Sequence, residues 1–503
     1  MTKRSRAKAR NNARKSKHPH KNSAAATTKA AQRNSQRPST TGRNKALTEI
    51  ALVEAVADSD VVYAIGAALP PKPQGSPGQE RYYPEVLVAF YAAFAGGTGT
   101  WRKGAAIMEE PAYWKIIRRY AAQRGVDLWE RPPLRCNCED ARDRICPKPP
   151  KSDSSSDTKK RRASPILEEI RAVFRSESCA MAKRHGCFDP NLHSIAQPAR
   201  ANTVCTDGKV NGTIVNAATV EKRRNRGQTI DGVLHQQGGD DGTPKHGMKF
   251  CHSCVRPDLK RNSRIIIDMQ YVPTSGYGGE AGLAVTSLTE LACTEPGADT
   301  ICYDGALRGV HLQALADTGY LVFSPPHGTT AKPHPLELTD GSCTCGTRHQ
   351  LHTENGHVAV RTIDEDGTVS MQRCPAKPPV RQHRASANRY DWYVVITLPC
   401  GSNHRLRINE PARDGGPLRI ERLRQSARDD EDPGDHYRQH YGRREDAESI
   451  NNIIERTFRG GRAISYTIDR QFLAMIGHAI ARNAIADALW KHDDVPADPP
   501  AAA

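Results

Sequence analysis

The segment Tyr441–Glu448 constrains the fold of this chain most, because it combines three functional side chains with helical spacing. Tyr441, Arg444 and Glu448 stand at relative positions 0, 3 and 7, which at about 100° per residue fall within about 60° of one another on a helix. One helix face therefore carries a phenol, a guanidinium and a carboxylate. The apolar residues that follow fall opposite, which predicts that they pack in a core while the polar face lines a cleft. They are Ile450, Ile453, Ile454 and Phe458.

Two isolated Asp-Gly steps lie upstream of this helix, and each follows a short run typical of a strand. Residues 201–206 lead into Asp207, and residues 300–303 lead into Asp304. An Asp at the carboxyl end of a buried strand projects into the crevice where open α/β sheets bind their ligands. An ordinary turn is the alternative for each step taken singly. Together with Glu448, the two Asp residues predict a site of three carboxylates.

The order Asp, Asp, Glu and the helix motif resemble the bacterial insertion-sequence DDE transposases of the cut-and-paste type, whose signature is Y-x2-R-x3-E-x6-K. The resemblance spans residues 200–490. It departs from the signature at Glu455, where the family has Lys, and Arg456 stands beside that position. The resemblance implies a ribonuclease-H-like catalytic domain, with an inserted β domain between the second and third carboxylates.

A DNA transposase is the implied activity, with metal-dependent cleavage at transposon ends followed by strand transfer into target DNA. Asp207, Asp304 and Glu448 would hold two Mg²⁺ or Mn²⁺ ions, with Asp207 as the bridging ligand, since hard oxygen ligands suit these ions. Two such ions stabilise charge on the attacking and leaving oxygens. The bringing together of two inverted-repeat ends implies a homodimer on double-stranded DNA. The DNA contacts implied by the motif are Tyr441, Arg444 and Arg456.

Two other functions stay open. A catalytically inactive, transposase-derived DNA-binding or regulatory protein is favoured by the departure at Glu455 and disfavoured by the presence of all three carboxylates. A structure-specific nuclease of the same fold would share the metal site without recognising terminal repeats. Other carboxylates also compete for the site. They are Asp268 after an apolar run, Asp240 and Asp241 in a glycine-rich loop, and Glu445 one turn before Glu448.

Positive charge is concentrated at the amino end. The formal net charge is +17, and residues 1–46 contain fourteen Lys or Arg and no acid, so the remainder carries +3 (17 − 14). This tail has almost no large apolar residues, so it cannot offset its ordering entropy by burial and is predicted to be disordered. A polybasic tail gains affinity for DNA phosphates through counterion release. A membrane-surface role is the alternative, disfavoured by the lack of an apolar face.

Apolar runs and cysteine use predict the compartment. No run approaches the ~18 apolar residues that a bilayer span needs, and no signal-peptide core follows the basic start. We expect a soluble protein without a membrane partner, cytoplasmic and associated with a bacterial nucleoid. The fourteen Cys are scattered, which predicts reduced thiols there. Cys205 and Cys302, each two positions before a predicted site Asp, are expected in strand interiors.

Hydrophobic periodicity predicts an α/β fold with a mixed sheet flanked by helices, and the family resemblance implies that this sheet is ribonuclease-H-like. A helical DNA-binding domain precedes it, for which a plain packing module is the alternative. Residues 131–163, rich in Pro and Ser, predict a linker. The predicted order is 1–46 disordered basic tail, 47–130 helical domain, 131–163 linker, 164–330 catalytic domain (first part), 331–436 β-rich insertion, 437–493 catalytic domain (second part) and 494–503 disordered tail.

The predicted insertion contains two Cys-x3-His pairs, Cys345 with His349 and Cys400 with His404. Zinc favours thiolates and imidazoles in tetrahedral geometry, so we predict a structural Zn²⁺ at these four residues. Coincidence is the alternative in a chain with fourteen Cys and nineteen His. Further candidate ligands are Cys343, His352 and Cys374. Three Cys in the predicted linker lack a fourth ligand, and zinc is not expected there.

Overall fold

The computed structural model describes residues 48–71, 83–147, 161–215, 217–235, 244–328, 332–336, 343, 345–346, 349–363, 365–410, 418–425 and 436–493. The chain divides into two units, Met1–Thr48 and Glu49–Ala503. The two tails predicted to be disordered, residues 1–46 and 494–503, lie outside the described residues, and so do Asp240 and Asp241.

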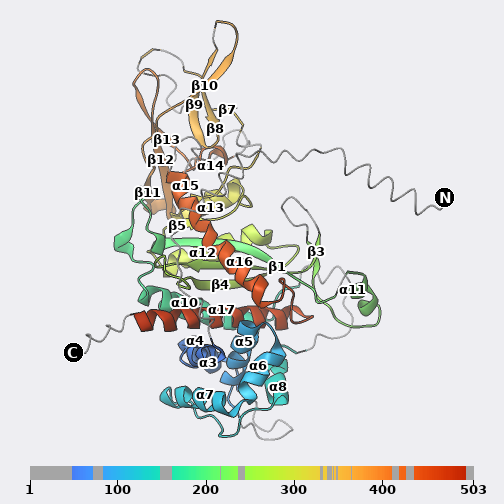
Figure 1. Ribbon diagram of the computed structural model, residues 1–503. Coiled ribbons are helices and arrows are strands. Elements are labelled where there is room, and N and C mark those ends of the chain that lie inside the picture. Colours follow the sequence, from blue (N-terminus) through green and yellow to red (C-terminus); the bar gives the residue numbers. More distant parts are fainter. Residues whose placement is uncertain are drawn as a thin grey trace, which may run out of the picture. The chain divides into compact units, whose positions relative to one another are not determined.

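A mixed sheet of six strands forms the centre of the second unit (Figure 1). The strand order is β2-β3-β1-β5-β6, and β4 also pairs with β3. Strand β3 is antiparallel to its partners, whereas β5 is parallel to β1 and to β6. The strands are β1 Thr203–Gly212, β2 Val233–His235, β3 Lys245–Val255, β4 Ile265–Val272, β5 Thr300–Cys302 and β6 Leu321–Phe323. The predicted mixed α/β class is confirmed.

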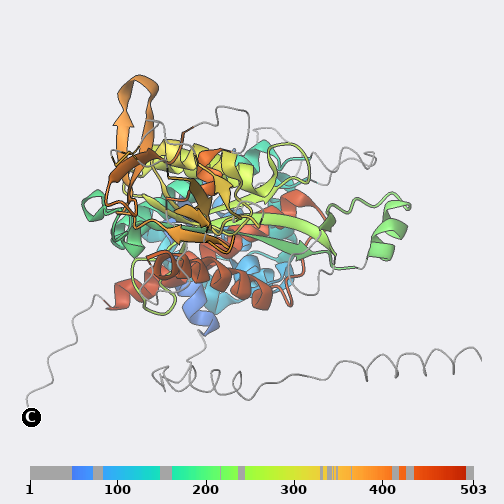
Figure 2. The ribbon, with the colours of Figure 1, turned by 90° about the horizontal axis from the view of Figure 1, so that it is seen from above.

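Helices cover this sheet. Strand β4 is buried at every residue, as expected for a strand with both faces covered. α10 (Pro165–Arg184) and α17 (Ile468–Asp493) pack on it, and α12 (Gly279–Thr294) packs against α13 (Gly309–Thr318). The ribbon of β1, β2 and β3 extends toward α11 (Ala217–Arg224), which lies at the periphery of this unit in both views (Figure 1, Figure 2).

A layer of helices packs on α17 from the side away from the sheet (Figure 1). It confirms the helical prediction for residues 47–130. Helix α5 lies so close to α17 that a Cβ added at Gly477 would stand 2.0 Å from the carbonyl oxygen of Ala92, an approach that only glycine permits. The helices are α3 Glu49–Ala57, α4 Asp60–Ala68, α5 Val86–Thr98, α6 Trp101–Glu109, α7 Pro111–Gln123 and α8 Arg135–Ile145.

Helix α8 corrects the predicted linker at residues 131–163. The segment begins with prolines, but these stand before the N-cap residue Leu134 and so do not interrupt the helix. The side chain of Asn137 accepts a hydrogen bond from the backbone N–H of Leu134 at 2.8 Å, which caps the helix start. Cys138 and Ile145 are buried against the helical layer, so α8 is a packed element. Residues 148–160 lie outside the described residues.

Two small sheets form the insertion, which confirms its β-rich prediction. The first has the order β10-β9-β8-β7 and the second β11-β12-β13. The second docks on α13, because the indole N–H of Trp392 donates to the carbonyl of Ala316 at 2.8 Å. The elements are β7 His334–Pro335, β8 Leu351–Glu354, β9 His357–Ile363, β10 Val369–Arg373, β11 Val380–Arg384, β12 Arg389–Thr397, β13 Asn403–Arg407 and α14 Arg419–Arg422.

The helix that carries the Tyr-Arg-Glu motif is interrupted. It consists of α15 (His436–Tyr441), a 3-10 turn at Gly442–Arg444 and α16 (Glu445–Thr457). Further 3-10 turns cover Pro190–Leu192, Arg200–Asn202 and Ala385–Ala387. In the described part of the chain, no helix has both the length and the apolar character needed to cross a bilayer.

Candidate active site

The sequence predicted Asp207 at the end of a strand. In the structure Asp207 lies within β1 instead. The strand continues to Gly212 because β3 pairs with it along this length, with His252 opposite Asp207. The parallel partner β5 stops earlier, where Cys302 pairs with Cys205. Asp207 therefore stands just beyond the parallel ladder, and the alternative of an Asp-Gly turn is wrong at this position.

Asp304 follows β5, as predicted. Its carboxylate accepts a hydrogen bond from the backbone N–H of Ala306 at 2.9 Å, which forms an Asx turn. Cys205 and Cys302 lie opposite each other in the parallel pairing of β1 and β5. Asp207 and Asp304 each follow two residues after these partners. Residues two apart on a strand share a face, so both carboxylates belong to one face of the sheet.

The motif helix crosses this face, and two cysteine thiols attach it there. Cys205 donates to the carbonyl of Arg443 and Cys302 donates to the carbonyl of His440, both at 3.2 Å. Each cysteine stands two positions before a site Asp and shares its face. The prediction that these cysteines lie in strand interiors is confirmed. They position the motif helix over the two Asp residues.

The two sides of α16 behave as predicted. Its apolar side is buried at Ile450 and Ile454, with Phe458 buried directly after the helix and Ile453 half-buried. Glu448 lies on the other side, where its side chain keeps 48 % of its exposure. The helix thus places a carboxylate at the edge of the site while its opposite side joins the core.

Arg444 joins two of the predicted site carboxylates. Its guanidinium forms an ion pair with Glu448 and lies 3.6 Å from Oδ2 of Asp207. Asp207 also accepts hydrogen bonds from the backbone N–H of Gly208 at 2.8 Å and from the amide of Asn451 at 3.0 Å. The sequence reasoning missed Asn451, although its position three residues after Glu448 places it on the same helix face.

The site is acidic, and Asp207 is its buried carboxylate. Burial raises the pKa of Asp207 to about 6; Arg444 opposes this shift, whereas the negative charges of Asp304 and Glu280 add to it. Burial also raises the pKa of Tyr441, again opposed by Arg444 and assisted by Asp304. Asp304 acts on both groups, so the phenol and the carboxylates lie near one another.

The carboxylate oxygens of Asp207, Asp304 and Glu448 do not all lie close enough together to bind one metal ion directly. Within the described ranges, one set of three or more Cys, His, Asp or Glu has all its ligand atoms within 4.8 Å of one another, and it lies elsewhere. Arg444 occupies the space between Asp207 and Glu448 instead. Arg456 is exposed, and its role in DNA binding stays a prediction.

Glu280, at the start of α12, is a fourth carboxylate that sequence reasoning missed. It accepts a hydrogen bond from the hydroxyl of Tyr303 at 2.8 Å and forms an ion pair with Lys249. A Cβ added at Gly208 would stand 2.4 Å from its carboxyl carbon, so Glu280 packs directly on bare backbone beside Asp207. An acidic residue in the first turn of a helix is common and gave no signal of this role.

The departure from the motif at Glu455 has a structural counterpart. Glu455 forms an ion pair with Lys209 of β1 at 2.7 Å. The ammonium group of Lys209 therefore lies beside Glu455, where the family signature has its Lys. It comes from the strand that carries Asp207 and not from the helix. The sequence spacing could not reveal a contact between residues so far apart in the chain.

Asp268, the main competing carboxylate, is a structural residue. Arg171 binds it with two parallel hydrogen bonds of 2.8 and 2.7 Å, and Ser287 and Gln270 donate to it as well. Burial by itself would raise the pKa of Asp268, but Arg171 outweighs it and holds the pKa at about 2. Its acceptor sites are already used, which leaves little capacity for a metal.

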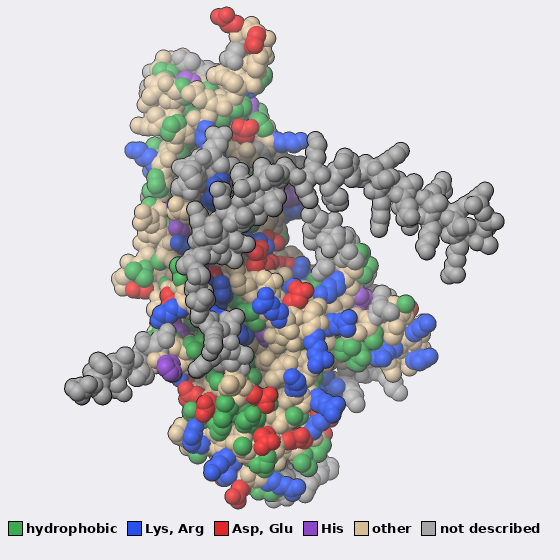
Figure 3. Space-filling view, in the orientation of Figure 1, with side chains coloured by type: hydrophobic (Ala, Val, Ile, Leu, Met, Phe, Trp, Pro, Cys, Tyr) green, Lys and Arg blue, Asp and Glu red, His purple; other side chains and the backbone are tan. Residues whose placement is uncertain are grey.

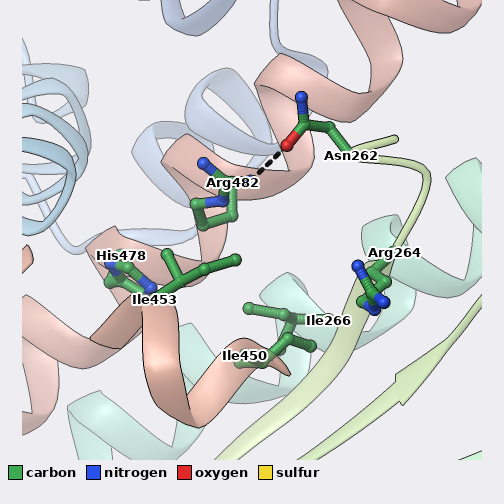
Figure 4. A pocket seen from close by; sticks show the side chains of 7 residues that line it. All are labelled: Asn262, Arg264, Ile266, Ile450, Ile453, His478 and Arg482. Atoms are coloured by element: carbon green, nitrogen blue, oxygen red, sulfur yellow. Dashed lines mark hydrogen bonds between the residues drawn. The ribbon is translucent and has the colours of Figure 1, made fainter. Parts of the chain in front are cut away.

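Arginines gather on the side of α16 away from Asp207. The buried carboxylate of Asp446 forms ion pairs with Arg200, Arg256 and Arg264. Arg264 also lines a small pocket opposite Arg482 (Figure 4). Arg482 hydrogen-bonds Asn262 at 3.1 Å, and no carboxylate among the described residues pairs with it. Burial, Arg264 and Arg261 lower the pKa of Arg482, so this cluster carries uncompensated positive charge.

A second set of candidate ligands lies in the insertion. Cys343, Cys345, His349 and Cys400 have ligand atoms within 4.8 Å of one another, and this Cys3His set can hold a metal such as zinc. Three of the four predicted ligands are thus brought together. His404 is not in the set, because strand pairing holds it opposite Ile396 of β12, and Cys343 stands in its place.

No family model matches this chain, and no curated protein matches it.

Proposed function

We propose that this chain is a DNA transposase of the insertion-sequence type, which cleaves DNA at transposon ends and transfers the freed strand into target DNA. One observation carries the proposal: the Tyr-Arg-Glu helix lies across two adjacent parallel strands that carry Asp207 and Asp304, and Arg444 reaches both Asp207 and Glu448. Chain segments more than 130 residues apart meet at one site (440 − 302 = 138).

A ribonuclease-H-like catalytic domain is the finer fold that we propose. The ladder of antiparallel strands β4, β3 and β1, continued by the parallel strands β5 and β6, supports it. Helices α12 and α13 connect the last strands. The first carboxylate lies on β1, the second follows β5, and the third lies on a helix near the carboxyl end, in the order that the family resemblance implies.

The concentration of negative charge at this site supports a divalent cation as its ligand. Asp207 is buried near Asp304 and Glu280, whose charges favour its protonated form, and an arginine already lies between Asp207 and Glu448. Asp207, Asp304 and Glu448 would hold Mg²⁺ or Mn²⁺, which suit oxygen ligands. When bound, these ions supply charge stabilisation for the attacking and leaving oxygens of a phosphodiester.

The chain's own groups prepare the site. The backbone N–H of Gly208 and the amide of Asn451 fix the orientation of Asp207. Tyr441 stacks on Tyr437 with ring centroids 5.2 Å apart, which holds its ring at the edge of the site for contact with a nucleotide. Arg444 is the group that we assign to a DNA phosphate, since a guanidinium matches phosphate geometry.

Double-stranded DNA is the partner that we propose, bound by a homodimer that brings two ends together. Lys and Arg side chains are numerous on the face that carries α16 (Figure 3). Arg482, which lines the same pocket as Arg264, adds positive charge that no carboxylate among the described residues pairs with. Buried guanidiniums without carboxylate partners are costly, and a phosphodiester backbone would supply the missing negative charge.

The direct test is cleavage by the purified full chain. The substrate is a plasmid that carries the gene with its flanking genomic sequence, incubated with Mg²⁺ or Mn²⁺. We expect metal-dependent breaks at the two element ends, mapped by primer extension. Breaks at branched structures without regard to the ends would favour the nuclease. DNA binding with no metal-dependent cleavage would favour the inactive regulatory protein.

Removal of Arg444 is expected to strengthen metal binding in the absence of DNA. The Arg444 guanidinium competes with a cation for Asp207 and Glu448. Arg444→Gln should therefore raise the affinity for Mn²⁺ about tenfold, because removal of one neighbouring charge commonly changes the binding of a cation to a carboxylate by about one order of magnitude. Electron paramagnetic resonance of free Mn²⁺ during a titration measures it. The matched control is Arg456→Gln, an exposed arginine of the same helix. Equal affinities in both variants would show that Arg444 does not guard the site.

Deletion of residues 1–46, which lie outside the described residues, is expected to weaken DNA binding and flatten its salt dependence. Each neutralised phosphate contributes about −0.9 to the slope of log K against log salt on duplex DNA. Fluorescence anisotropy of a labelled duplex, measured at several salt concentrations for the full and shortened chains, gives both slopes. Identical slopes would exclude the tail as a DNA contact, and unchanged far-UV circular dichroism serves as the folding control.

A further inference from the structure

We infer that Cys343, Cys345, His349 and Cys400 form a structural zinc site that joins the two sheets of the insertion. This inference does not depend on the proposed reaction, because the four residues lie outside the acidic site. Their ligand atoms lie within 4.8 Å of one another. Three thiols and one imidazole are a ligand set typical of structural zinc.

The spacing of the ligand atoms fits tetrahedral coordination. The Sγ atoms of Cys343 and Cys400 are 3.4 Å apart, and Sγ of Cys345 lies 3.5 Å from Nε2 of His349. Bond lengths of about 2.3 Å for Zn–S and 2.0 Å for Zn–N place tetrahedral ligands about 3.5–3.8 Å apart. The observed separations therefore agree with these values within a few tenths of an ångström.

A disulfide between Cys343 and Cys400 is the competing explanation. It would use two of the four groups and leave Cys345 and His349 beside it without a role. Bonded sulfurs stand about 2.05 Å apart, whereas these two are 3.4 Å apart, and both cysteines are free thiols. The convergence of all four groups from two chain segments favours the metal.

The site would connect two sheets that share no ladder among the described residues. Cys343, Cys345 and His349 precede β8 of the first sheet, and Cys400 lies in the turn between β12 and β13 of the second. The outer strands β10 and β11 are largely exposed, so the insertion has little core of its own. A metal supplies folding free energy where burial is insufficient.

Zinc would also stabilise the contact between the insertion and the catalytic sheet. The second sheet reaches α13 through the indole of Trp392 and through Asn409, whose amide donates to Asp317 at 2.7 Å. The turn that contains Asp304 precedes α13 in the chain. A fixed hairpin turn at Cys400 would thus restrain the sheet that packs on α13.

Metal analysis of the full chain tests the inference. Protein purified from zinc-supplemented culture and dialysed against a weak chelator is expected to retain about one zinc per chain, measured by plasma mass spectrometry. Cys345→Ser and Cys400→Ser should each lower the zinc content at least about tenfold. Cys374→Ser is the matched control, because Cys374 is a buried cysteine of the same insertion outside the set, and it should retain the metal.

A second measurement keeps the test valid if a variant misfolds. Cobalt substituted into wild-type protein should give the intense visible bands of tetrahedral thiolate coordination, together with sulfur charge-transfer absorption. A wild-type chain without zinc and without these bands would overturn the inference. So would a disulfide between Cys343 and Cys400 found by mass spectrometry of protein purified under reducing conditions. Full zinc retention in Cys343→Ser with its loss in His404→Ala would overturn the assigned ligand set.

Discussion

Asp207→Asn, Asp304→Asn and Glu448→Gln are each expected to lower DNA cleavage about 10³-fold, the size of effect that follows removal of one preorganised charge-stabilising group. The reason is that an amide keeps the shape of the side chain but loses the negative charge that would hold a divalent cation. DNA affinity should stay within about twofold, because phosphate contacts depend on other groups. An excision assay on a substrate with its native ends and an anisotropy titration measure the two effects.

Glu445→Gln is the matched control for this series. Glu445 begins α16, is exposed and stands one turn before Glu448, so its substitution alters charge on the same helix without reaching Asp207. Wild-type cleavage is expected of it. A site variant that cleaves at the rate of this control would remove its residue from the catalytic assignment, and loss of cleavage in the control would mean that overall helix charge is responsible.

Local patterns in the sequence predicted the elements well. The polar and apolar sides of α16 are set by spacing within one helix, and burial of Ile450 and Ile454 confirms them. The strand before Asp304 and the β-rich insertion also follow from composition and alternation. Three members of the Cys3His set were predicted, and two of them, Cys345 and His349, form a local pair. In all these cases the deciding interaction spans few residues, and the sequence itself displays it.

Long-range partners decided what the sequence could not predict. β1 continues past Asp207 because β3 pairs with it, and nothing in residues 201–208 specifies that partner. Cys343 replaces His404 in the Cys3His set because strand pairing holds His404 opposite Ile396. Glu280 and Lys209 reach the site from other elements. Such contacts depend on how the sheet is assembled, which a single sequence does not reveal.

Arg171→Met is expected to lower the free energy of unfolding by about 3–5 kcal/mol, because it leaves the buried charge of Asp268 without its main partner. The Asp268 side chain keeps only 3 % of its exposure, and Arg171 binds both its oxygens. Urea unfolding of the full chain at pH 7 measures the change. The matched control is Glu168→Gln, which removes the exposed second partner of Arg171 and should cost at most about 0.5 kcal/mol.

The pH dependence identifies the cause of this loss. In the wild type the pKa of Asp268 is about 2, below its value near 3.9 in the unfolded chain, so its stabilising contribution is present above pH 4 and is lost as the pH falls toward 2. In Arg171→Met, burial should raise the pKa instead, because a protonated carboxyl is cheaper to bury. The folded variant then binds more protons than the unfolded chain, and its stability falls as the pH rises. Its deficit should therefore be smaller at pH 4 than at pH 7, and Arg171→Met with Asp268→Asn should recover most of the loss. An equal deficit at both pH values would trace it to lost packing of the arginine stem and not to the charge on Asp268.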